Sequence, residues 1–235
     1  SSNIVDAALN GGSGSDTIAF GYWGGGQVMD YTLNTGVTSN FENIVGSGGD
    51  DTLKGDASAN VIHGGKGDDK IYGLDGDDTL WGNVEYNGAG GLPWNLHGNN
   101  TRAGHNNYND LMKGDDHLLG GAGNDILQGG GGADILDGGT GKDTIRADEG
   151  ADVIVLRAGD GSTTLSQADI LQDFKDGTDT FGLADGLSFS DLTITQGTGD
   201  YANDTLISKT SSSEYLAVVN GLSASVLTEV DFVGL

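Results

Sequence analysis

Single aliphatic residues recur at intervals of nine along much of this chain, separated mostly by Gly, Asp and other polar residues. The clearest stretch, GGKGDDKIYGLDGDDTLWG at 64–82, repeats one phrase almost twice. Ten copies of this nine-residue frame carry Ile or Leu at position eight: Ile18, Leu53, Ile62, Ile71, Leu80, Leu118, Leu127, Leu136, Ile145 and Ile154. A flexible linker has no reason to keep such a phase, so the pattern indicates a folded repeat protein.

Each frame predicts one short strand and one tight turn. The three residues around position eight form a strand whose middle side chain points inward, because side chains alternate across a strand. The six residues rich in Gly and Asp form the turn, where glycine permits positive φ and close backbone approach. Two frames make a coil of 18 residues, and stacked coils make a roll of two sheets with a thin aliphatic core. The expected fold is therefore all-β, a parallel β-roll or β-solenoid.

Position six of the frame carries an acidic residue in nine of the ten copies and Asn60 in the tenth. The nine acids are Asp16, Asp51, Asp69, Asp78, Asp116, Asp125, Asp134, Asp143 and Asp152. Stacked turns would bring these carboxylates together with backbone carbonyls, a donor set that suits a hard cation with about six to eight oxygen ligands. This favours Ca²⁺ over Mg²⁺, which requires a tight octahedron and keeps its own waters.

The spacing of 18 residues also predicts which carboxylates are neighbours. Asp134 has partners on both sides, at Asp116 and Asp152, within one uninterrupted block of repeats. Asp16 is separated from the other copies by residues 21–45 and is expected to be isolated. Asn60 offers a neutral oxygen, which predicts a weaker ion site in its coil.

Charge and composition narrow the possible partners. The 235 residues include 35 acidic and 10 basic side chains, for a net charge of −25, which disfavours nucleic acid and favours multivalent cations. Cysteine is absent, which excludes disulfides and thiolate zinc sites. No apolar run approaches the roughly 18 residues of a membrane span. The chain begins Ser-Ser without a signal peptide, so we expect a piece from the C-terminal end of a longer protein. We also expect it to be a monomer.

The tandem frames resemble the RTX nonapeptide GGxGxDxUx, the calcium-binding parallel β-roll of proteins exported by type I secretion. The resemblance implies several Ca²⁺ ions, each bound by position-six Asp side chains and by the carbonyls of positions one and three. The implied carbonyl ligands are Gly64, Lys66, Gly73, Asp75, Gly120, Ala122, Gly129, Gly131, Gly138 and Thr140. The frame at 55–63 departs from the pattern, which puts its site in doubt.

The repeats divide the chain into five parts. Residues 1–45 hold a first repeat and an interrupting segment, expected to be an edge hairpin or loop. Two blocks of RTX repeats follow, at 46–82 and 111–155, separated by a looped insert at 83–110. The insert is rich in Asn and aromatic residues, which either cover the thin core or bind a sugar. Residues 156–235 are expected to form a β-rich C-terminal cap.

Two parts of the cap extend the resemblance. The stretch ADILQDFKDGTDTFGL at 168–183 is similar to the segment that ends RTX rolls in secreted proteases, lipases and alginate epimerases. There, acidic residues help to bind a capping calcium, and the matching positions here are Asp169, Asp173 and Asp179. Strand alternation follows at 191–196, 204–209 and 214–222. The final SVLTEVDFVGL resembles a type I secretion signal.

The sequence therefore predicts a calcium-binding module that folds outside the cell, supports type I secretion and stabilises an attached passenger. The alternative is a polysaccharide-binding or adhesive module of an extracellular enzyme or adhesin. No Ser/His/Asp signature or convergent acid/base set is evident, so we expect no catalysis by this segment; its parent protein is expected to be a secreted hydrolase, epimerase or adhesin. The expected location is extracellular or at the cell surface, with the type I secretion machinery as a partner.

Overall fold

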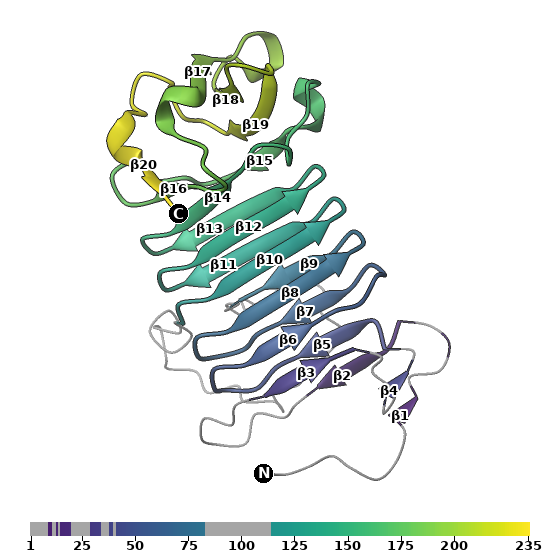
Figure 1. The fold of residues 1–235 in the computed structure, drawn as a ribbon. Coiled ribbons are helices and arrows are strands. Elements are labelled where there is room, and N and C mark those ends of the chain that lie inside the picture. Colours follow the sequence, from purple (N-terminus) through teal and green to yellow (C-terminus); the bar gives the residue numbers. More distant parts are fainter. Residues whose placement is uncertain are drawn as a thin grey trace.

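The computed structural model describes residues 9–10, 13, 15–19, 29–33, 38–39, 41–82 and 114–235. Figure 1 shows short strands stacked coil upon coil into an elongated roll, with the C-terminal segment at one end. The described part contains no α-helix; its helical elements are the short 3₁₀ turns η2 (Leu165–Gln167), η3 (Phe189–Asp191), η4 (Gly199–Tyr201) and η5 (Glu229–Asp231). None of them is long and apolar enough to cross a membrane.

Two sheets form the walls of the roll. The eight-stranded sheet contains β3 (Asp30–Thr32), β6 (Thr52–Lys54), β8 (Lys70–Asp75), β10 (His117–Ala122), β12 (Ile135–Thr140), β14 (Val153–Leu156), β16 (Thr180–Leu183) and β20 (Phe232–Gly234). The ten-stranded sheet contains β2 (Thr17–Ala19), β5 (Asn43–Val45), β7 (Val61–His63), β9 (Thr79–Trp81), β11 (Ile126–Gly131), β13 (Thr144–Glu149), β15 (Asp169–Leu171), β19 (Glu214–Val219), β18 (Thr205–Lys209) and β17 (Leu192–Gln196). A separate parallel pair joins β1 (Leu9–Asn10) to β4 (Thr38–Ser39).

The register of the sheets confirms the predicted coil of 18 residues. Leu118 lies beside Leu136 where β10 pairs with β12, and Leu127 lies beside Ile145 where β11 pairs with β13, both in parallel. All ten position-eight residues are buried, Ile18 being the most exposed at 8%. The predicted all-β parallel β-roll is therefore confirmed, with its core where the aliphatic period places it.

Glycine at position four of the frame allows the turns to stack closely. Gly123 has φ of +146°, and a Cβ built on it would lie 1.7 Å from the Gly76 carbonyl oxygen of the neighbouring coil. Gly141 repeats this geometry, 1.6 Å from the Gly123 oxygen. Any larger residue would push adjacent turns apart, which explains why the frame keeps glycine here.

The two predicted blocks stack as one continuous roll. Strand β8 pairs in parallel with β10, and β9 pairs with β11, so Ile71 lies beside Leu118 although they are 47 residues apart. The structure describes the chain up to Gly82 and again from Gly114, and both parts belong to the same stack of coils. The insert at 83–110, and with it the predicted sugar-binding or core-covering role, lies outside the described residues.

The expectation of an edge hairpin or loop at 21–45 is wrong for the part that is described. Strand β3 pairs in parallel with β6, whereas β5 pairs in parallel with β2 and β7 in the other sheet. Ile44 is fully buried and Tyr31 packs against the core, so these two side chains fill the positions that the aliphatic residues fill elsewhere. This coil lacks the Gly- and Asp-rich turn phrase, which is why the pattern concealed it.

The C-terminal segment extends both sheets and then closes them. Strands β16 and β20 add in parallel to one sheet, and β15 and β19 add in parallel to the other, before β18 and β17 turn antiparallel. Aromatic rings fill this end of the core: Phe174 stacks on Phe181 at 4.4 Å, and Phe181 stacks on Phe232 at 5.0 Å between ring centroids. The segment is β-rich, as expected.

A matched pair of substitutions tests the core assignment. Leu127 is fully buried, whereas its neighbour Ile126 is 49% exposed on the outer face of the same strand. We expect Leu127→Ala to lower the free energy of unfolding by about 2–5 kcal/mol, because it leaves a cavity in a thin core. Ile126→Ala should change it by less than about 1 kcal/mol. Chemical denaturation in saturating calcium measures both, and equal losses would contradict the inward orientation of position eight.

Candidate metal centre

Position-six side chains form a ladder along each edge of the roll. The first ladder contains Asp51, Asp69, Asp116, Asp134, Asp152 and Asp179, and the second contains Asn60, Asp78, Asp125, Asp143 and Asp169. All of these residues are buried. Each Asp uses its Oδ1 to accept a hydrogen bond from a backbone N–H of the preceding coil, as Asp134 does from Asp116 at 2.8 Å. The stacking predicted from the 18-residue spacing is thus present on both edges.

The other carboxylate oxygen is left without a hydrogen bond at the centre of the ladders. Asp16 Oδ2, outside these two ladders, is buried and has no hydrogen-bond partner. Within the ladders the same is true of the Oδ2 atoms of six aspartates: Asp69, Asp78, Asp125, Asp134, Asp143 and Asp152. A buried carboxylate oxygen without a donor is costly unless a positive charge approaches it. These six oxygens therefore mark places where a cation would stabilise the fold.

Beside five of the six unpaired oxygens there is space because position one is glycine; in the frame of Asp152 this position is Ala147. A Cβ built on Gly120 would lie 2.4 Å from Asp125 Oδ2 and 2.4 Å from the Gly138 carbonyl oxygen of the next coil. At Gly73 the corresponding atoms are Asp78 Oδ2 at 2.3 Å and the Gly120 oxygen at 2.5 Å. A carboxylate of one turn and a carbonyl of the next therefore face the same small space.

The donor set fits calcium. Among the described residues, no group of three or more His, Cys, Asp or Glu side chains converges on one point, so side chains alone do not complete a metal site. A site must combine Asp oxygens with backbone carbonyls, and an all-oxygen set of this kind suits Ca²⁺ rather than Zn²⁺ or another transition metal.

The carbonyls implied at position one face the position-one glycines of the preceding coils. The oxygens of Gly64, Gly73 and Gly129 lie 2.1, 2.6 and 2.7 Å from Cβ atoms built on the position-one glycines of the preceding coils. Those glycines are Gly46, Gly55 and Gly82. Gly82 occupies the position-one place next to Asp116, because its built Cβ would lie 2.3 Å from Asp116 Oδ2. The sequence reasoning missed Gly82, since the insert separates it from that turn.

The carbonyls implied at position three instead join one coil to the next. The oxygens of Ala122, Gly131 and Thr140 accept backbone hydrogen bonds of 2.8, 3.0 and 3.0 Å from the preceding coils. Two other position-three residues also contact a neighbouring coil: Lys66 donates its N–H to the Ser47 carbonyl at 3.3 Å, and Asp75 lies beside Ala122. A carbonyl oxygen has two lone pairs, so these bonds leave one for a metal.

The ends of the first ladder differ from its centre. Asp51 has hydrogen bonds to both oxygens, from Met29 N–H to Oδ1 and from Ser47 N–H to Oδ2. Asp179 likewise accepts the Lys175 N–H with its Oδ2. These local donors reduce the need for a cation at either end.

The three acids predicted in the cap have different positions. Asp169 and Asp179 continue the two ladders, because they accept the N–H groups of Asp143 and Asp152 at 2.9 and 3.3 Å. Asp173 lies outside the ladders and accepts the N–H groups of Ala147 and Asp148, both at 2.9 Å.

Glu42 is a ladder residue that the sequence reasoning missed. Its Oε2 accepts the Asp16 N–H at 2.7 Å, as position-six Oδ1 atoms do elsewhere. The available signal was its place two residues before the buried Ile44, the spacing that separates Asp from the aliphatic residue in every frame. The sequence predicted that Asp16 would be isolated, and this prediction is wrong. Asp16 is stacked on the coil that contains Glu42.

The pattern changes at Asn60. Its side-chain oxygen accepts the Asp56 N–H of its own turn at 2.8 Å, and its amide nitrogen donates to the Glu42 carbonyl at 3.1 Å. The Asn60 amide thus has hydrogen bonds for both its oxygen and its nitrogen, whereas the carboxylates at the equivalent positions of other coils have one oxygen without a partner.

Asp134 is not the single two-sided carboxylate that the separate blocks suggested. The Asp69 N–H donates to Asp116 Oδ1 at 2.7 Å, and the Asp78 N–H donates to Asp125 Oδ1 at 2.7 Å. Because the roll continues across the insert, Asp69, Asp116 and Asp125 also have neighbours on both sides.

Burial makes these carboxyls hold protons when no cation is bound. Desolvation is the largest cause and raises the pKa of Asp134 to about 7, with the charge of Asp152 adding to the shift. The pKa values of Asp69 and Asp169 rise to about 8, and those of Asp125 and Asp152 rise to about 6, again mainly because of burial. A cation that binds here must displace protons near neutral pH.

These raised pKa values predict opposite pH effects with and without calcium. The carboxyls bind protons more tightly in the folded ion-free chain than in the unfolded chain, where the pKa is near 3.8. Ion-free stability from these groups is therefore complete below about pH 4 and lost as the pH rises through about 6 to 8. In chelator, circular dichroism should show more β-structure at about pH 5 than at about pH 8.

In calcium the direction reverses, because protons and Ca²⁺ compete for the same oxygens. The calcium concentration at the midpoint of folding should rise as the pH falls from about 8 to about 6. A midpoint that stays constant over this range would contradict calcium binding to the ladder carboxylates.

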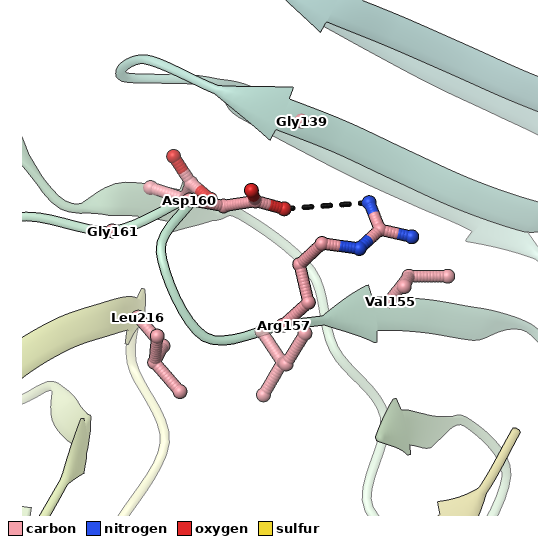
Figure 2. A pocket seen from close by; sticks show the side chains of 8 residues that line it. Gly139, Val155, Arg157, Asp160, Gly161 and Leu216 are labelled. Carbon is pink, nitrogen blue, oxygen red and sulfur yellow. Dashed lines mark hydrogen bonds and ion pairs between the residues drawn. The ribbon is translucent and has the colours of Figure 1, made fainter. Parts of the chain in front are cut away.

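A small pocket lies near the cap end of the second ladder (Figure 2). It is lined by Gly139, Val155, Leu156, Arg157, Asp160, Gly161, Asp169 and Leu216. Arg157 Nη1 and Asp160 Oδ2 point toward one another across it at 3.4 Å. The charges of Arg157 and Asp160 in its lining are thus paired with each other.

Comparison with known proteins agrees with the geometry. Residues 38–71, 55–84, 112–145 and 128–162 each match the model of the RTX calcium-binding nonapeptide repeat. No curated protein sequence matches the chain.

Two solved structures are similar to parts of the chain. One is the solution structure of the AlgE6R3 subunit from the Azotobacter vinelandii mannuronan C5-epimerase, with 26% identity and a TM-score of 0.39, covering 51% of this chain and 72% of that one. The other is the extracellular lipase LipA from Serratia marcescens, with 17% identity and a TM-score of 0.36. This alignment covers 87% of the present chain but only 42% of the lipase.

The nine-residue sequence period, the two aspartate ladders and the match to the RTX repeat model all concern the same stretches of the chain. They define a structural calcium-binding module built as a β-roll, and the repeats at 38–84 and 112–162 belong to the RTX calcium-binding nonapeptide family.

Proposed function

We propose that this chain is an extracellular module that folds when several Ca²⁺ ions bind between its stacked turns. The observation that supports this proposal is the row of six buried aspartate oxygens without hydrogen bonds. Each would contribute to an ion together with the position-one carbonyl of the next coil. Calcium supplies the positive charge that compensates these carboxylates, and the glycines at position one leave room for it.

Calcium binding and folding are coupled because the unfolded chain does not form the sites. The net charge of −25 opposes compaction, and the ladders place carboxylates next to one another in a low-dielectric environment. An ion that binds only the folded chain stabilises it by mass action, more strongly as its concentration rises above the dissociation constant. A low-calcium cytosol therefore keeps the chain unfolded and the calcium-rich exterior folds it.

This coupling suits export by the type I secretion machinery and protection of an attached passenger. The proposed secretion signal at 225–235 contains β20, which pairs with β16 and buries Phe232. In the folded chain this segment is part of the sheet, so the machinery would have to bind it before folding. A chain that folds only in calcium keeps the signal available inside the cell.

Calcium should convert the chain from a largely unfolded state to the β-roll cooperatively. We expect the far-ultraviolet circular dichroism in chelator to lack most β-structure and to gain it on titration, with a midpoint on the order of 10⁻⁴ to 10⁻³ M. Magnesium should be far less effective, because the sites use many carbonyl oxygens. The same β-content in chelator and in calcium would refute the proposal, and equal potency of magnesium would contradict the proposed ligand set.

A charge-only substitution tests one ladder position. Asp134→Asn keeps an oxygen that accepts the Asp116 N–H but removes the charge next to the ion. We expect the calcium midpoint to rise roughly threefold to tenfold, because contacts with a charged group exceed those with a neutral one by about 1 kcal/mol.

The matched control for Asp134→Asn is Asp115→Asn. Asp115 is exposed and accepts the Ala133 N–H with its Oδ1, which the amide oxygen can still do. Its variant should leave the midpoint nearly unchanged. Equal shifts for the two variants would mean that general charge, rather than the buried ladder, controls calcium affinity.

A further inference from the structure

The stacking of the roll is the same on both sides of the insert. Strands β8 and β9, which precede the insert in the sequence, pair in parallel with β10 and β11, which follow it. In the core, Ile71 lies beside Leu118 and Leu80 lies beside Leu127, and all four side chains are fully buried. We call this contact, between the residues before the insert and the residues after it, the joint.

Hydrogen bonds from side chains cross the joint in both directions. The Asp78 N–H donates to Asp125 Oδ1 at 2.7 Å, and in the opposite direction the Asn124 N–H donates to Asp77 Oδ1 at 2.8 Å. The other edge of the roll has the same two kinds of bond, of 2.7 and 3.1 Å. The joint therefore keeps the register of coils that belong to one uninterrupted block.

On one edge, a candidate ion space is bounded by oxygens from both sides of the insert. A Cβ built on Gly73 would lie 2.3 Å from Asp78 Oδ2 and 2.5 Å from the Gly120 carbonyl oxygen. Asp78 is only 1% exposed, and its Oδ2 has no hydrogen-bond partner. A cation bound between these two oxygens would connect a residue before the insert to a residue after it.

The other edge has a second space of this kind. A Cβ built on Gly82, which precedes the insert, would lie 2.3 Å from Asp116 Oδ2 and 2.7 Å from the Gly129 carbonyl oxygen, which both follow it. The joint thus has one candidate ion space on each edge, and each space is bounded by both parts of the chain.

Without a cation, like charges oppose each other at the joint. The carboxylates of Asp78 and Asp125 come from opposite sides of the insert and interact unfavourably when both are ionised. A bound cation would replace this repulsion with attraction to oxygens of both parts.

We propose that Ca²⁺ ions in these two spaces join the two parts of the roll, so that the joint holds in calcium without a peptide connection. The proposal rests on the calcium-driven folding proposed above and adds which ions unite the chain across the insert. It follows that the connection at 83–113 can be cut while the roll remains one body in calcium. In chelator, the cut chain separates into two fragments.

A cut within the insert tests the proposal on the full chain. A protease recognition sequence is placed between Gly90 and Gly91 and cleaved in chelator, and calcium is then added. Size-exclusion chromatography with light scattering should show one complex with the mass of the uncut chain in calcium, and two fragments in chelator. The calcium midpoint for β-structure should rise by roughly twofold to fivefold on cutting, because separate fragments replace a tethered effective concentration on the order of millimolar.

The possible results separate the joint from the proposed function. Fragments that stay apart in calcium, at a concentration where the uncut chain folds, would overturn the joint and leave calcium-driven folding intact. Fragments that stay together in chelator would show that calcium is not what joins them. An uncut chain with the same β-content in chelator and in calcium would overturn the proposed function itself.

Substitutions at one space test which ion acts at the joint. Gly73→Ala places a methyl group between Asp78 Oδ2 and the Gly120 carbonyl. In saturating calcium, the cut chain's fragments should then exchange with labelled fragments faster by on the order of tenfold or more. Asp78→Asn keeps an oxygen that accepts the Asn60 N–H but removes the charge, and should act in the same direction.

The matched control is Gly138→Ala. A Cβ at Gly138 would lie 2.3 Å from Asp143 Oδ2, the same crowding as at Gly73, but both residues follow the insert. Gly138→Ala should weaken calcium binding to the uncut chain about as much as Gly73→Ala does. It should accelerate fragment exchange by less than about threefold, because it is distant from the joint. Equal acceleration by the two variants would contradict the assignment of the joining ion to Asp78 and Gly120.

Discussion

The stability of the fold depends on how the negative charge of its buried aspartates is compensated. Each strand of the repeats contributes one inward aliphatic side chain, so the hydrophobic core is thin along the whole roll. The same frame buries an aspartate two residues before that side chain in eight of its ten copies. Burial raises the pKa of these carboxyls, which means that the ionised form is unfavourable until a cation arrives. Stability of the roll is consequently tied to whatever neutralises the ladders.

Much of this arrangement is local in the sequence, which is why it could be predicted. A frame of nine residues specifies strand, turn, inward side chain and position-six acid at once, so the ten core residues and the two ladders follow from the period alone. The β-rich cap was predicted from alternation in its strands, and Asp169 and Asp179 from a family resemblance. Even so, the sequence did not indicate that position-three carbonyls such as those of Ala122 and Thr140 would accept hydrogen bonds between coils.

The features that escaped prediction are non-local. Strand β8 pairs with β10 although the insert separates them in the sequence, and only the stacked structure reveals that Gly82 occupies the position-one place next to Asp116. Glu42 and Ile44 form a frame without the Gly- and Asp-rich turn phrase, because a ladder position requires only an acceptor oxygen in the right place, and the longer Glu side chain reaches it. Similarly, Ser47 satisfies the second oxygen of Asp51 through a turn that looks like any other in sequence.

A stacked repeat protein is stabilised by contacts between neighbouring coils. At the end of the stack, where one neighbour is missing, the stabilising interactions must change. Here the ladders stop at Asp169 and Asp179, and in the next strand of the ten-stranded sheet Ala217 replaces the acid. Beyond that point a carboxylate would have no stacked partner with which to share an ion, and the core widens to accommodate Phe181 and Phe232 instead. Charge compensation by an external ion thus gives way to apolar burial within one coil. Arginine and lysine side chains lie at that boundary, where acids persist but the stack of turns that would cage an ion has ended.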